Sequence, residues 1–166
     1  MQTNARGILL DIEGTTSSIR FVYDVMFPFV RRELDAFLTE HWDDEAVAAA
    51  CQQIALDAGH ESLSAWSSDD DAQKQADLVR GEVIRLMDHD VKATGLKSLQ
   101  GLIWRSGFES GEMVAHVYDD VAPALLQWKQ ANLDIRIYSS GSIGAQKLFF
   151  GPVSYTHLTL PTIDSV

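Results

Sequence analysis

The sequence has few of the features that mark secreted, membrane-bound or nucleic-acid-binding proteins. Its 166 residues include a single cysteine, Cys51, so no disulfide can form within the chain. No apolar run is long enough to span a bilayer, and no signal-peptide core precedes the first apolar segment. Acidic residues outnumber basic ones by 24 to 13, which argues against a nucleic-acid backbone or an anionic membrane as partner. We therefore expect a protein of the reducing cytoplasm that binds neither membrane nor nucleic acid.

What the chain does contain is an apolar segment that stops on two carboxylates. Residues 7–10 are followed by Asp11 and Glu13 at a spacing of i, i+2. This pattern predicts a buried strand with both acids at its carboxyl end, where open α/β sheets bind ligands. Gly14 permits a tight turn there, and the two following threonines supply hydroxyl and amide donors. Such a group suits a metal ion and an anion, with a helix cap at Asp11 as the alternative.

A second apolar segment ends on hydroxyl groups. Residues 135–138 run into Ser139 and Ser140, and a helical pattern follows from Ile143 to Phe150. A strand that enters a helix through Ser-Ser-Gly presents backbone N–H groups, hydroxyls and the positive end of the helix dipole to an anion. Taken alone, this Ser-Ser-Gly segment indicates only a favourable N-terminus for a helix. Combined with the first strand, it predicts carboxylates and Mg²⁺ on one side of a phosphoryl group and serines on the other.

Apolar residues at helical spacing fill the stretch between these two strands and predict about four helices. They are Phe29, Val30, Leu34, Phe37, Leu38, Val47, Cys51, Ile54, Ala58, Leu78, Val79, Val83, Leu86, Met87, Leu96, Leu99 and Ile103. Residues 59–71 are polar and are predicted to form a loop. An insertion of this size is too long for an ordinary crossover, so we expect it to pack as its own small bundle over the strand ends.

Three segments carry a resemblance to a known family. They are residues 11–19 (DIEGTTSSI), residues 92–104 (KATGLKSLQGLIW) and residues 137–142 (IYSSGS), the last continued by residues 145–148 and 150–151. Together they resemble the enolase-phosphatase branch, or acireductone synthases, of the haloacid dehalogenase-like hydrolases. Glu13 narrows the branch, because the wider superfamily has aspartate at this position.

The resemblance implies an α/β fold: a Rossmann-like haloacid dehalogenase core, incomplete here, with an inserted all-helical cap. The predicted parts are a partial core of residues 1–18 and 112–151, a cap of residues 19–111 and a non-family tail of residues 152–166. The family's further α/β units would carry a phosphate-binding lysine and another acidic metal ligand. We therefore expect a C-terminally truncated chain that is unstable and nearly inactive. The tail's alternation could instead form an edge strand that ends at Pro161.

The resemblance also implies roles for the residues at the strand ends. Asp11 would be the nucleophile that forms an aspartyl-phosphate, and Glu13 the general acid and then base. The Asp11 carboxylate and a backbone carbonyl at Glu13 would hold the Mg²⁺ ion, and Ser139 and Ser140 would bind the phosphoryl oxygens.

Two cap residues are candidates for binding the substrate. Lys97 and Gln100 lie one helical turn apart and could face the site together, with an exposed pair on a solvated helix face as the alternative. The implied substrate of the branch is small and phosphorylated, 2,3-diketo-5-methylthiopentyl-1-phosphate, which is enolised and dephosphorylated to an acireductone in methionine salvage. A generic sugar-phosphate phosphatase and an inactive fragment are the alternatives. We expect a monomer.

Overall fold

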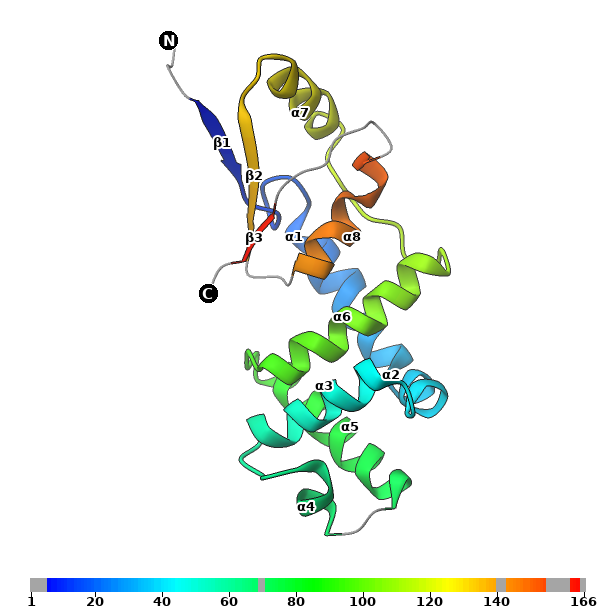
Figure 1. The fold of residues 1–166 in the computed structure, drawn as a ribbon. Coiled ribbons are helices and arrows are strands. Elements are labelled where there is room, and N and C mark those ends of the chain that lie inside the picture. The colour runs from blue at the N-terminus through cyan, green and yellow to red at the C-terminus, as the bar shows by residue number, and fades with distance from the viewer. Residues whose placement is uncertain (1–5, 69–70, 140–142, 155–161, 165–166) are drawn as a thin grey trace. The chain divides into compact units, whose positions relative to one another are not determined.

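The computed structural model describes residues 6–68, 71–139, 143–154 and 162–164, and from residue 151 onward by the backbone alone. The elements in chain order are β1 (Gly7–Leu10), α1 (Ile19–Phe21), a π-helical turn η1 (Val22–Met26), α2 (Phe27–His41), α3 (Glu45–Asp57), α4 (Leu63–Ser67), α5 (Ala72–Asp88), α6 (Thr94–Glu109), α7 (Val121–Gln130), β2 (Asp134–Ser139), α8 (Ile143–Ser154) and β3 (Thr162–Asp164) (Figure 1). They form two compact units. The sheet unit comprises Met1–Phe27 and Gly107–Val166, and the helical unit comprises Pro28–Ser106.

The sheet unit is built on a parallel sheet in the order β1-β2-β3. Gly7 pairs with Asp134 and Leu10 with Ile137, while Ser139 at the end of β2 pairs with Asp164. Helices α7 and α8 lie on the same side of this sheet (Figure 1). A parallel sheet whose first two strands are joined through an all-helical segment confirms the predicted fold class.

The helical unit has its own apolar core, and that core consists mainly of the residues predicted from helical spacing. Its buried members include Val30, Leu34, Leu38, Val47, Cys51, Ile54, Val79, Val83, Leu86, Leu96, Leu99 and Ile103. Burial raises the pKa of the Cys51 thiol from 9.0 to about 12, because the thiolate would lose its hydration. The lone cysteine is therefore a small core residue, as an alanine-rich helix predicts.

Helix α6 approaches α3 closely at Gly95. A Cβ atom at this position would lie 2.5 Å from the backbone nitrogen of Ile54, closer than such atoms can approach. The Gly95 N–H also donates a hydrogen bond to Asp57 Oδ2 at 2.7 Å. Glycine is thus required here by contact between helices.

The prediction of a loop over residues 59–71 is wrong in part, because α4 lies within it. Ser62 precedes this helix and its Oγ accepts a hydrogen bond from the Ala65 N–H at 2.9 Å. A serine cap thus starts one turn of helix in a segment with few apolar residues. The short span gave no helical periodicity by which to recognise it.

The tail begins as a continuation of α8. The predicted helix over 143–150 is confirmed and extends to Ser154, so Val153 lies in a helix and not in an edge strand. The rest of the predicted edge strand, residues 155–161, lies outside the described residues. The strand that the structure does describe here, β3, follows Pro161 and pairs with β2. No helix in the described parts of the chain is long and apolar enough to cross a membrane.

Candidate active site

The sheet unit brings two predicted site segments to one edge of the sheet. Asp11 directly follows β1, and Ser139 is the last residue of β2. Because β1 and β2 are paired in parallel, with Leu10 opposite Ile137, both strands end at the same edge. Ser140, the second predicted anion ligand, lies outside the described residues.

The chain turns sharply after β1 around the carbonyl group of Ile12. This oxygen accepts hydrogen bonds from the N–H groups of Thr15, Thr16 and Ser17 at 3.3, 3.1 and 2.9 Å. Gly14 donates to the Ser17 carbonyl at 2.8 Å and has a φ of 80°, a conformation that side chains disfavour. The turn therefore holds the Asp-x-Glu segment in a fixed loop at the edge of the sheet.

The Asp11 carboxylate is exposed and oriented by the backbone. Its Oδ1 atom accepts a hydrogen bond from the Ile12 N–H at 2.8 Å, and the Asp11 carbonyl accepts one from Thr16 Oγ1 at 3.1 Å. The alternative role as a helix cap is wrong, because Ser18 caps α1 through a bond from the Arg20 N–H to its Oγ at 3.2 Å. Among the described residues, the second Asp11 oxygen has no hydrogen-bond partner and is open to a ligand.

Asp11 and Glu13 could hold a magnesium ion. The described residues contain no group of three or more histidine, cysteine or carboxylate side chains suited to a metal. Mg²⁺ does not require such a group, since it commonly takes one or two carboxylates and completes its octahedron with water and substrate phosphate. The exposed Asp11 carboxylate, with the backbone carbonyl of Glu13 two residues further along the turn, fits that requirement.

A histidine that the sequence analysis did not single out connects the two passages of chain that enter and leave the helical insertion. The Ser18 N–H donates to His116 Nδ1 at 3.2 Å, and Ser17 Oγ lies 3.5 Å from the same atom. Nearby, the Tyr118 N–H donates to the Thr16 carbonyl at 3.1 Å. These contacts join residues about one hundred positions apart, and no local sequence pattern could have indicated them.

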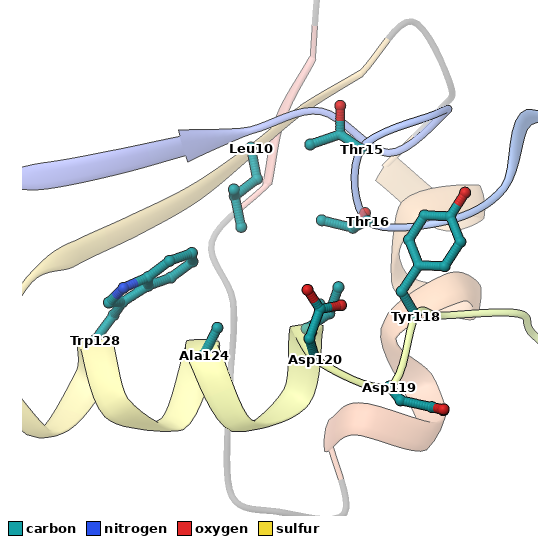
Figure 2. Close-up of a pocket in the computed structure, with 9 residues that line it drawn as sticks. Leu10, Thr15, Thr16, Tyr118, Asp119, Asp120, Ala124 and Trp128 are labelled. Atoms are coloured by element: carbon teal, nitrogen blue, oxygen red, sulfur yellow. The ribbon is translucent and has the colours of Figure 1, made fainter.

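A pocket of about 610 Å³ lies beside this loop within the sheet unit. It is lined by Leu10, Thr15, Thr16, Tyr118, Asp119, Asp120, Val121, Ala124 and Trp128. Figure 2 shows Leu10 and Trp128 at one end of the pocket and Thr16, Tyr118 and Asp120 at the other. Neither Asp11 nor Glu13 lines it, but Leu10, the residue before Asp11, does. The Asp119-Asp120 pair before α7 was the only sequence signal for it.

The two predicted cap ligands belong to the helical unit, on α6. Lys97 is exposed, whereas Gln100 is only 5% exposed and lies among the buried residues of the helix. The pair is thus one turn apart along the helix but differs in burial. Their roles toward the substrate stay predictions.

The arrangement is that of the haloacid dehalogenase-like class. A parallel sheet has Asp-x-Glu directly after its first strand and serine at the end of its second, with a helical insertion between the two strands.

Comparison with known proteins identifies the branch of this class. No family model matches the chain. It is 42% identical over 147 residues to enolase-phosphatase E1 of Drosophila melanogaster, a match that covers 89% of this chain and 57% of the relative. It is 44% identical over 144 residues to enolase-phosphatase E1 of Alcanivorax borkumensis, covering 87% of this chain and 59% of the relative.

A solved structure agrees with these matches. The UTR4 protein of Saccharomyces cerevisiae has 30% sequence identity and a TM-score of 0.67, over 97% of this chain and 67% of that protein. The chain belongs to the enolase-phosphatase family. It spans 57–59% of the length of these curated relatives.

Proposed function

We propose that this chain carries the phosphoryl-transfer end of a Mg²⁺-dependent, bifunctional enolase-phosphatase. The proposed substrate is 2,3-diketo-5-methylthiopentyl-1-phosphate, and the proposed product is an acireductone of methionine salvage. We propose that the protein acts in the cytoplasm as a monomer. The observation that carries the proposal is the meeting of Asp11 and Ser139 at one edge of a parallel sheet. The relatives named enolase-phosphatase supply the reaction.

Asp11 is the proposed nucleophile. The Ile12 N–H donates a hydrogen bond to one carboxylate oxygen, and the other oxygen would attack phosphorus. The phosphoryl group would pass to Asp11 as the bond from phosphorus to the substrate oxygen breaks. Glu13 would give its proton to that leaving oxygen. It would then take a proton from water, which attacks the aspartyl-phosphate and releases phosphate. The Asp11 carboxylate and the backbone carbonyl of Glu13 would hold Mg²⁺, whose positive charge would neutralise the phosphoryl oxygens.

The other proposed contacts come from hydroxyl and cap side chains. Ser139 and Ser140 would donate hydrogen bonds to phosphoryl oxygens, and Lys97 and Gln100 would hold the remainder of the substrate. The parts that we propose are a core of residues 1–18 and 112–151, a cap of residues 19–111 and a non-family tail of residues 152–166.

The test measures phosphate release with Mg²⁺ from this substrate and from glucose 6-phosphate. We expect faster phosphate release from the diketone than from glucose 6-phosphate. Release should be abolished in Asp11→Asn and unchanged in Asp43→Asn, which alters an exposed aspartate of the helical unit. A preference for the sugar would favour the generic phosphatase.

A second readout does not depend on turnover. Beryllofluoride mimics a phosphoryl group on a carboxylate, so its Mg²⁺-dependent binding can be followed by ¹⁹F NMR. We expect a bound signal from the wild-type chain and from Asp43→Asn, and none from Asp11→Asn. An equal signal from Asp11→Asn, or none from the wild type, would reject Asp11 as the nucleophile.

A further inference from the structure

The ring of His116 is held in one orientation by its aromatic neighbours. It stacks on Phe21, with centroids 6.2 Å apart and an interplanar angle of 28°, and meets Tyr118 edge-on at 5.2 Å. Phe21 in turn meets Phe149 of α8 edge-on at 5.5 Å. His116 is thus exposed but packed within a row of aromatic rings, which limits the directions in which its two nitrogens can point.

One hydrogen bond determines which His116 nitrogen carries the proton. The Ser18 N–H, which can only donate, lies 3.2 Å from His116 Nδ1. Nδ1 is therefore the unprotonated acceptor, and the neutral ring carries its proton on Nε2. Ser17 Oγ lies 3.5 Å from the same acceptor. His116 therefore presents a lone pair, and not a proton or a charge, to Ser17 and Ser18.

The residues beside this acceptor are those that close the Asp-x-Glu turn. The Ser17 carbonyl accepts a hydrogen bond from the Gly14 N–H at 2.8 Å, and Glu13 and Ser17 form an isolated parallel β-bridge. Ser17 itself is only 1% exposed. The Tyr118 N–H donates to the Thr16 carbonyl at 3.1 Å, and the two residues lie side by side in Figure 2. A displacement of Ser17 would therefore move the backbone that carries Glu13.

We propose that His116 is a positioning residue for Glu13. Its Nδ1 atom fixes Ser17 and Ser18, and these residues fix the turn from which Glu13 gives and takes its proton. The inference rests on the proposed function, in which Glu13 is the general acid and base. It adds a residue that follows the helical insertion in the chain. Because a general acid acts in the transition state, a displaced Glu13 lowers kcat and leaves KM almost unchanged.

Two substitutions separate a role of the acceptor from a role of the ring. His116→Asn places an amide oxygen near the position of Nδ1 but removes the ring, whereas His116→Leu keeps an apolar side chain beside Phe21 and Tyr118 but removes the acceptor. The proposal requires His116→Leu to be the more damaging change. His89→Leu is the matched control, because His89 Nδ1 lies 2.7 Å from the Arg85 carbonyl, a backbone contact of the helical unit.

The first measurement is amide hydrogen exchange at Gly14, whose N–H is bonded to the Ser17 carbonyl. We expect His116→Leu to speed this exchange at least about tenfold, and His116→Asn and His89→Leu to change it less than about threefold. Exchange at Ile137 in β2 checks that the sheet is intact in each variant. If leucine disturbs the sheet, His116→Gln replaces it, because the glutamine amide reaches the position of Nε2 and not that of Nδ1.

The second measurement is the kinetics of phosphate release from the diketone with Mg²⁺. We expect His116→Leu to lower kcat at least about tenfold while KM changes less than about threefold. His116→Asn should restore kcat to within about threefold of the wild-type value, and His89→Leu should match the wild type.

Two outcomes would overturn the proposal. One is an equal effect of His116→Leu and His116→Asn, no effect included, or a larger loss of kcat in His116→Asn, because the acceptor would then be irrelevant. The other is a rise in KM alone, since His116 would then serve substrate binding. A wild-type chain without Asp11-dependent release would overturn the proposed function, and exchange at Gly14 would then decide alone whether His116 holds the turn.

Discussion

The two units of this protein differ in how completely each buries its own large apolar side chains. In the helical unit the large apolar residues of four helices meet in one core, with Ile54 and Leu99 fully buried. In the sheet unit Leu9 and Tyr138 remain exposed on one face of the sheet. Helices can pair with neighbours in the same stretch of chain, whereas a parallel sheet needs helices on two faces from distant segments. The comparison indicates that the helical unit buries its large apolar side chains more completely than the sheet unit does.

The largest expected effect is loss of a core side chain in the helical unit. Leu99→Ala should lower the free energy of unfolding by about 2–5 kcal/mol, because it leaves a cavity among fully buried residues. Leu56→Ala, at a residue that is 44% exposed, should cost less than about 0.5 kcal/mol. Urea unfolding followed by helical circular dichroism measures both. Equal losses would mean that the helical unit has no specific core.

The next effect is a contrast between two glycines. Gly95→Ala should lower the free energy of unfolding by about 1–3 kcal/mol, since its Cβ atom would strike the backbone of α3 at Ile54. Gly81→Ala should instead raise it by about 0.5–1 kcal/mol, because a Cβ atom there meets nothing within 4 Å and alanine favours the helix. The same urea titration separates them. If both substitutions changed the free energy of unfolding in the same direction, α3 and α6 would not be closely packed at Gly95.

Alkaline pH should weaken the helical unit through Cys51. Its thiol pKa is raised by burial from 9.0 to about 12, so this contribution to stability is complete below pH 9 and is lost as pH rises toward 12. Between pH 8 and 10 the loss should be about 1 kcal/mol. Cys51→Ala should show a shallower decline over the same range, leaving only the titration of other groups. Parallel curves for both proteins would contradict the burial of this thiol.

The smallest effect concerns the sheet unit. His116→Ala should remove the hydrogen bond from the Ser18 N–H and cost about 0.5–1.5 kcal/mol. Hydrogen exchange at the Ser18 amide should become faster, whereas His41→Ala, in the helical unit, should leave it unchanged. Unaltered exchange in His116→Ala would show that this contact does not hold the two passages of chain together.

The sequence allowed the strand ends and the helical core to be predicted because their signals are local. Asp11 stops an apolar run, and Leu34, Ile54 and Leu99 recur at helical spacing, so each could be assigned from a window of a few residues. The short helix α4 escaped because five residues hold too little periodicity. Its serine cap was the only local sign.

Long-range features could not be predicted in the same way. The contact between Ser18 and His116 and the register of Leu10 with Ile137 join segments on either side of the helical insertion. The pocket lined by Leu10 and Trp128 likewise depends on how α7 lies against the sheet. The chemistry of the two strand ends and the family resemblance both indicated that these distant residues belong to one core, but neither carried information about their contacts.

The pairing of Gly7 with Asp134 also bears on the order of folding. These partners are separated by almost the whole described chain, and closing a loop of that length as a flexible coil costs conformational entropy before any contact compensates for it. Prior formation of the helical unit would replace most of that loop with a compact body of local contacts. On the ribosome β1 would emerge before the helical unit, and it would stay unpaired while the helical unit folds and until β2 is synthesised. We therefore predict that the helical insertion folds before the two strands on either side of it pair.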